Sequence, residues 1–182
     1  MGEECGVILI AADPAVDDNR HRSVLAGAEG FVRMALGGGD LVVGSELAHE
    51  GIDSNNLGDR SKLRGSFFGE FGRPVGSAWR LLTGLRLDHH EDFGWEASPS
   101  LSASRTLGAG RIFASVARSY RAPSFTETFY TDPNNLGDPD LAAESAWQYE
   151  AGGSMSVSGG RIEGAVFLRR ENNIIDYVRA DT

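Results

Sequence analysis

The residues with the most obvious capacity for chemistry lie in a stretch rich in Asp, Asn and Pro, residues 132–140. The spacing of its acidic, amide and glycine residues partly matches a calcium-binding loop that begins at Asp132. Leu136 and Ala143 then stand where such a loop requires oxygen ligands. Because Asp, Asn, Gly and Pro are also the usual residues of tight turns, we favour an Asx-rich turn over a calcium site.

A second polar cluster, His89-His90-Glu91-Asp92, contains residue types that bind metals. Adjacent side chains on an extended chain point in opposite directions, so they form a poor ligand set, and we expect a solvated loop instead. The sequence contains no nucleophile–base motif, no zinc-protease motif and no phosphate-binding loop that opens a helix. It therefore predicts neither an enzyme nor a bound cofactor or metal.

The composition narrows the class of protein further. The 182 residues carry a net charge of -9, which argues against nucleic acid as a partner. Cys5 is the only cysteine, so no internal disulfide can form. The sequence shows no signal peptide and no apolar run near the roughly 20 residues of a membrane helix. This excludes helical spans only, because a membrane-spanning strand needs about 9–11 residues with every second one apolar.

The elements that position these residues are predicted to be strands. Residues 1–21 are expected to form an irregular segment, and residues 22–182 a partial β-barrel. Short glycine-containing turns alternate with long connections at 52–60, 89–95 and 122–143, which is typical of a transmembrane β-barrel wall. The eight expected strands cover about 22–35, 40–51, 61–73, 78–88, 96–107, 111–121, 144–157 and 161–176.

Side chains alternate along most of these segments. Large apolar residues share one face and charged residues share the other, as expected for strands with lipid outside and water inside. A half-buried antiparallel sheet would give the same stripe, so periodicity alone leaves both open. Arg118 shares the apolar face near a strand end, where it could snorkel to the interface. Members of the apolar set include Leu63, Phe67, Phe71, Leu85, Leu87, Trp147 and Tyr149.

Four short motifs surround the longest loop and the strand that follows it. They are Tyr120-Arg121-Ala122-Pro123, Pro139-Asp140-Leu141 with Glu144, Tyr149-Glu150-Ala151-Gly152, and the stretch from Glu171 to Tyr177. In these motifs the chain resembles the TonB-dependent outer-membrane receptors, most closely their cobalamin and siderophore branches. The resemblance extends over about residues 22–180.

This resemblance implies an all-β fold in which about eight antiparallel strands form part of a larger barrel of about 22 strands. Such receptors sit in lipid in the bacterial outer membrane and import a scarce ligand, such as an iron-siderophore or cobalamin. They are energised through TonB, which binds an N-terminal region. Since the sequence shows no plug domain, no TonB-binding segment and no terminal aromatic residue, we expect an internal barrel fragment that does not transport alone.

The resemblance also implies that aromatic and polar side chains of the external loops contact the ligand. In the longest loop this role carries over to Phe125, Phe129, Tyr130 and Asp132. Packing of these aromatic rings against neighbouring loops is an equally good interpretation. The pentapeptide Asn-Asn-Leu-Gly-Asp occurs at 55–59 and again at 134–138, and we expect both copies to share a turn conformation.

Two alternative functions remain. A self-contained eight-stranded outer-membrane barrel, acting as an adhesin or structural protein, requires pairing between strands 22–35 and 161–176. A soluble β-sandwich that acts as a binding module would remain in the aqueous phase as a stable monomer without detergent.

Overall fold

The alternating apolar and polar residues form eight long antiparallel strands joined as a meander. The computed structural model describes residues 20–92, 94–131 and 136–176. All strands belong to one sheet in the order β1 to β8, so each strand pairs with its neighbours in sequence. This confirms the predicted all-β, antiparallel, hairpin-connected wall. The elements are β1 (His21–Leu36), β2 (Gly39–Ser54), β3 (Arg60–Val75), β4 (Trp79–His90), β5 (Gly94–Leu107), β6 (Gly110–Arg121), α1 (Phe125–Phe129), β7 (Glu144–Val157) and β8 (Gly160–Asn172).

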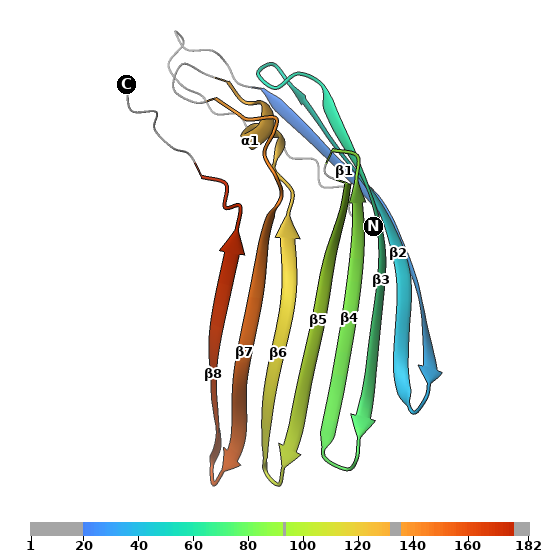
Figure 1. The fold of residues 1–182 in the computed structure, drawn as a ribbon, viewed down its shortest axis with the longest axis vertical. Coiled ribbons are helices and arrows are strands. Elements are labelled where there is room, and N and C mark those ends of the chain that lie inside the picture. The colour runs from blue at the N-terminus through green and yellow to red at the C-terminus, as the bar shows by residue number, and fades with distance from the viewer. Residues whose placement is uncertain (1–19, 93, 132–135, 177–182) are drawn as a thin grey trace.

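The two ends of the strands carry different connections, as predicted. The tight turns after β1, β3, β5 and β7 lie at one end of the sheet, here called the turn end (Figure 1). α1 and the longer loops lie at the other, here called the loop end, together with the short connection between β4 and β5. In the first turn, Gly37 and Gly38 have φ values of 56° and 76°. Residues with a Cβ rarely adopt this conformation, which explains the glycines of that hairpin.

Several strands extend further towards the loop end than the sequence indicated. β4 continues to His90 and β5 begins at Gly94, and His89 is opposite Trp95 in the ladder. The predicted long connection at 89–95 is therefore wrong. Of the two histidines expected in a solvated loop, His90 is buried and His89 is exposed. β8 ends at Asn172, before the predicted 176, and Asn173 has a φ of 53° that interrupts the extended backbone.

The two faces of the sheet differ in chemistry. Phe67 is 61% exposed and Leu47 is 55% exposed on the apolar face, where nothing in the described residues covers them. The opposite face carries hydrogen-bonded charged side chains of β2, β3 and β4. Because the described chain forms a single sheet with no second layer, the β-sandwich alternative is not supported.

The sheet has two edges, β1 and β8, and these strands do not pair with each other within the described residues. The self-contained eight-stranded barrel required that pairing, so it is not supported either. β1 begins at His21, next to the predicted boundary at residue 22, and residues 1–19 lie outside the described part. No helix within the described ranges is long and apolar enough to cross a membrane.

The pairing between β5 and β6, here called the β5–β6 seam, does not extend along the full length of the strands. The ladder between β5 and β6 ends at the pair Ser100–Ala117, whereas β4 pairs with β5 as far as Gly94. The ladder stops next to Pro99, which has no backbone N–H to donate and is therefore suited to an unpaired strand side. Arg118 lies beyond this point and donates to Glu96 Oε2 (2.9 Å) and to the carbonyl of Ala97. It therefore bridges the open seam, in place of the predicted snorkelling.

Candidate ligand site at the loop end

The loop that follows β6 contains a short helix, α1, that the sequence prediction missed. Ser124 is its N-cap: the Ser124 hydroxyl accepts from the Glu127 N–H (3.2 Å), and Glu127 Oε2 accepts from the Ser124 N–H (2.7 Å). This reciprocal arrangement is a capping box, and the Ser-x-x-Glu spacing that encodes it is visible in the sequence. Hydrogen bonds from Arg121, followed in importance by those from Ser124, lower the pKa of Glu127 to about 2.

The helix rests on the beginning of β3 through two cationic side chains. Lys62 Nζ donates to the carbonyl of Pro123 (2.9 Å) and lies 4.5 Å from the ring centre of Phe125. The Arg60 guanidinium lies 3.6 Å from the ring centre of Phe129. Cations over aromatic faces attract the ring quadrupole, so both contacts hold α1 against the sheet.

The second half of the loop packs back on α1. Gly137 N–H donates to the carbonyl of Tyr130 (2.6 Å), and Asp138 N–H donates to the carbonyl of Glu127 (3.0 Å). A Cβ on Gly137 would lie 2.9 Å from the backbone nitrogen of Phe129, so this approach requires glycine. Asp140 N–H donates to the Asp138 side chain (2.9 Å), which agrees with the predicted Asx turn chemistry.

The repeated pentapeptide does not adopt one environment. Leu57, in the first copy, is 3% exposed, whereas Leu136, in the second copy, is 80% exposed and pairs in an isolated bridge with Thr131. Gly58 has a φ of 70°, whereas Gly137 is not among the glycines with positive φ, so the described part of the second copy (136–138) does not share the predicted conformation; Asn134 and Asn135 lie outside the described residues. The surrounding segments decide the outcome, because the first copy closes a short hairpin and the second belongs to the long loop.

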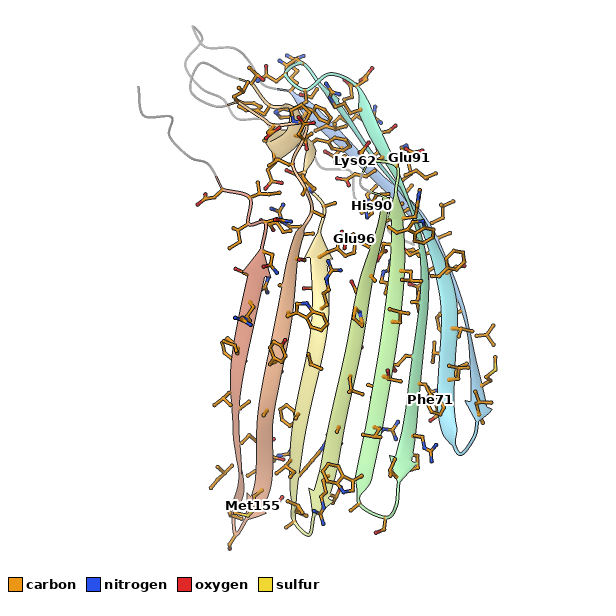
Figure 2. All side chains as sticks on the ribbon, viewed as in Figure 1. Lys62, Phe71, His90, Glu91, Glu96 and Met155 are labelled. Carbon is orange, nitrogen blue, oxygen red and sulfur yellow. The ribbon has the colours of Figure 1, made fainter. Side chains whose placement is uncertain are left out.

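A pocket of about 560 Å³ opens where the loop faces the upper ends of β3 and β5. Its volume lies within the range of small-molecule sites. Lys62 and Glu96 lie at the loop end in Figure 2, far from Phe71 and Met155 towards the turn end. Asp92, after β4, and Asn173, after β8, also line the pocket. Residues from α1 and from the segment before β7 form the rest of the walls: Thr128, Phe129, Pro139, Asp140, Leu141, Ala142 and Ala143.

The predicted ligand residues do not all lie in the pocket. Phe129 lines the pocket, whereas Phe125 is 6% exposed and packs beneath Lys62. Tyr130 forms the C-cap of α1 and is half-buried. Asp132 lies outside the described residues, as does part of the calcium-like stretch. Thr128, next to Phe129 on α1, also lines the pocket, although no local pattern in the sequence indicated it. Lys62 and Glu96 line it as well, but they come from segments that are distant in sequence.

Beneath the loop, an ionic cluster of five residues crosses the charged face of β2, β3 and β4. Asp88 is 1% exposed, and its Oδ1 accepts from Ser66 Oγ (2.6 Å), Arg86 Nε (2.9 Å) and Arg64 Nη1 (3.2 Å). Glu46 accepts from both arginines and completes the cluster. The buried carboxylate of Asp88 is thus paired and hydrogen-bonded, which is the condition for burying a charge.

The two histidines of the second polar cluster point in opposite directions, as expected for neighbours on a strand. His90 Nε2 lies 2.8 Å from the Tyr120 hydroxyl, and the His89 ring packs edge-on against Trp95 at 4.9 Å. Within the described ranges, no group of three His, Cys, Asp or Glu side chains is placed to hold a metal ion.

An antiparallel meander with an exposed apolar face, a charged opposite face and loops sorted to one end is the wall of a transmembrane β-barrel. Residues 23–182 match the family model described as "TonB dependent receptor-like, beta-barrel". The chain therefore belongs to this family, whose members are receptors of the bacterial outer membrane.

Two proteins named as siderophore receptors are among those that resemble the chain. The ferric enterobactin receptor PirA of Pseudomonas aeruginosa is 47% identical over 57 residues, which are 31% of this chain and 7% of that protein. The crystal structure of the siderophore receptor PirA from the same organism matches with a TM-score of 0.73 and 26% identity, over 83% of this chain and 31% of that chain. The crystal structure of PirA from Acinetobacter baumannii matches with a TM-score of 0.71 and 19% identity, over 86% of this chain and 28% of that chain. This last likeness shows the fold alone.

Proposed function

We propose that this chain forms part of the barrel of an outer-membrane receptor that takes up a ferric siderophore. The family match and the two resemblances to PirA of Pseudomonas aeruginosa carry this proposal. Because the chain spans less than a third of those relatives, transport requires the remaining strands, a plug and an N-terminal segment that engages TonB. The siderophore is preferred over cobalamin because both resemblances are to a protein named as a siderophore receptor.

The direct test is uptake by the receptor that contains this chain, expressed in a Gram-negative host without siderophore receptors of its own. We expect uptake of radioactive iron presented as ferric enterobactin, and loss of that uptake in a host without TonB. A matched measurement with radioactive cobalamin should show no accumulation. Uptake of cobalamin without uptake of the iron complex would assign the receptor to the other branch.

Location in the outer membrane is supported by the apolar face. Trp79 lies at the turn end of β4, and Trp95 lies opposite His89, ten residues further along that strand (79 to 89). Ten residues extend about 33 Å along a strand. At the usual tilt of about 35–45° this distance corresponds to a height of about 25 Å, which is the apolar band of an outer-membrane barrel. The two exposed indoles therefore match the two aromatic girdles of such a barrel.

Depth-dependent quenching can test this placement in bilayers. In variants that keep only Trp79 or only Trp95 among the three tryptophans of this chain, the fluorescence should be quenched most by lipids brominated close to the headgroup. A Leu85→Trp variant, in which Trp79, Trp95 and Trp147 are changed to Phe, should be quenched most by lipids brominated near the chain end. Equal quenching at all three positions would contradict a band bounded by these residues.

For the ligand itself, we propose contact with the pocket at the loop end through Phe129 and Tyr130, with Asp132 on the same loop. Phe125 is buried and would act by holding α1 in place. Phe129→Ala should raise the KM for ferric siderophore uptake by about threefold or more, as expected for loss of an aromatic contact. Leu107→Ala, near the turn end, serves as a control and should leave the KM unchanged.

A further inference from the structure

Arg121, the last residue of β6, joins separate segments of the chain. Its Nη1 and Nη2 donate to the two carboxylate oxygens of Glu127 on α1, each over 2.9 Å. Its Nε donates to Glu144 Oε2, at the first residue of β7, over 2.7 Å. A guanidinium that binds a carboxylate through two parallel hydrogen bonds fixes its orientation as well as its distance.

Both carboxylates are also held by backbone groups. Glu127 Oε2 accepts from the Ser124 N–H (2.7 Å) within the capping box, and Glu144 Oε1 accepts from the Ile175 N–H (2.6 Å) beyond β8. Arg121 therefore connects α1 with the start of β7 and, through Glu144, with the segment that follows β8. Three otherwise independent loop-end segments meet at one side chain.

The helix depends on such external connections. α1 has five residues, and a helix this short is not stable without tertiary contacts. The two ends of the loop at 122–143 meet at Arg121, which is opposite Glu144 in the β6–β7 ladder. The pocket has walls from α1 and from 139–143, so its shape depends on how α1 is held relative to this base.

We propose that Arg121 is a positioning residue for the ligand pocket: it latches α1 to the β6–β7 hairpin and holds the pocket in its ligand-receiving shape. The inference about ligand rests on the proposed function, whereas the latch is defined by the protein alone. Without the guanidinium, the carboxylates of Glu127 and Glu144 face each other as like charges, which disfavours the docked helix.

The latch can be tested first without ligand, by hydrogen exchange in the receptor that contains this chain. Arg121→Gln should accelerate exchange in 122–131 and 136–143 by about tenfold or more, because local opening becomes easier. Arg121→Lys keeps the charge but loses the paired hydrogen bonds, and should give an intermediate rate. Arg111→Gln, near the turn end of the same strand, is the matched control and should leave loop exchange unchanged. Unchanged exchange in Arg121→Gln would overturn the proposal.

The positioning role is tested by uptake kinetics. Arg121→Gln should raise the KM for ferric enterobactin by about tenfold while the maximal rate at saturating ligand changes by less than about twofold. An additional Glu144→Gln change removes the opposing carboxylate and should recover part of the lost exchange protection. Accelerated exchange with an unchanged KM would overturn the positioning role. Absence of any siderophore uptake by the unmodified receptor would instead contradict the proposed function, and the exchange result would be independent of it.

Discussion

The β2–β4 sector and the β5–β6 seam are both antiparallel, but they are held together by different interactions. β3 and β4 pair from Val75–Trp79 to Arg64–His90, and the ionic cluster around Asp88 links their charged face to β2. At the β5–β6 seam the ladder stops at Ser100–Ala117, and side chains span the remaining distance.

This difference coincides with the position of the pocket. The open part of the seam lies at the loop end, and Glu96, on its β5 side, contributes to the pocket wall and to the ion pair with Arg118. Tyr120 reaches further, to His90 on β4. A continuous ladder would hold β5 and β6 about 4.8 Å apart and leave no room between them. At the open part of the seam, β5 and β6 lack backbone hydrogen bonds to each other, which leaves space beside the loop. The side-chain hydrogen bonds of Arg118 and Tyr120 replace part of the missing ladder.

The largest loss of stability is expected when the buried carboxylate of Asp88 is removed from the ionic cluster that joins β2, β3 and β4. Asp88→Asn removes the buried carboxylate and leaves Arg64 and Arg86 with one shared carboxylate, Glu46, in place of two, which should lower the free energy of unfolding by about 3 kcal/mol. Denaturant unfolding in detergent micelles would measure it. Asp40→Asn is the matched control, because its ion pair with Arg33 is long (3.7 Å) and exposed. That control should cost less than about 0.5 kcal/mol, and equal losses in both variants would contradict the ionic cluster's role.

A smaller loss is expected from overpacking the same sector. A Cβ at Gly44 would lie 2.7 Å from the Gly30 carbonyl and would overlap the Phe68 ring. Gly44→Ala should therefore destabilise the sheet by about 2 kcal/mol. At Gly30, on the adjacent strand, a Cβ would meet nothing within 4 Å, so Gly30→Ala should be close to neutral in the same unfolding measurement. An unchanged free energy of unfolding in Gly44→Ala would show that the strands of this sector can shift to accommodate an added methyl group.

At the seam, the bridging side chain should have a local effect. Arg118→Gln removes a charge-assisted hydrogen bond to Glu96 and the bond to the Ala97 carbonyl, with an expected cost of about 1.5 kcal/mol. Hydrogen exchange should increase in 94–99 and 118–121 and remain unchanged in β3 and the turn-end half of β4. Spread of the effect into β3 would mean that the seam and the β2–β4 sector are one cooperative unit.

The smallest effect is expected on lowering the pH, which should weaken the docking of α1 in the loop beside the seam. Glu127 has a pKa of about 2 in the folded protein, below its ordinary value of 4.5, because Arg121 and then Ser124 donate hydrogen bonds to it. A lowered pKa means that this contribution to docking of α1 is complete above about pH 4.5 and is lost as the pH falls towards 2. The anisotropy of a fluorophore on Leu136→Cys, in a Cys5→Ser background, should therefore fall within that window, as the pH drops from about 4.5 towards 2. Glu127→Gln should remove this pH dependence, and an unchanged titration in that variant would assign it to another group.

Much of the architecture was predictable because it depends on local patterns. The alternation of Leu63, Phe67 and Phe71 with charged neighbours gave β3, and glycines such as Gly37 and Gly38 gave the tight turns. Two further local signals were present but not used. The Ser124–Glu127 spacing encodes the cap of α1, and Pro99 marks the place where the β5–β6 ladder stops. Among the candidate ligand residues, the sequence indicated a loop that borders the pocket but could not separate buried Phe125 from pocket-lining Phe129.

By itself, the sequence determined the number of strands, their hairpin order, the loop sorting and the two-faced chemistry of the sheet, because each of these follows from spacing within a few residues. Only the tertiary structure decided which partners meet. It brought Glu46, Arg64 and Asp88 together across three strands, placed Arg121 between Glu127 and Glu144, and assigned different burial to the identical leucines Leu57 and Leu136. These contacts depend on the register between strands and on segments distant in sequence. The sequence alone could not indicate them, because the alternating pattern of a strand does not specify which strand lies beside it or in which register.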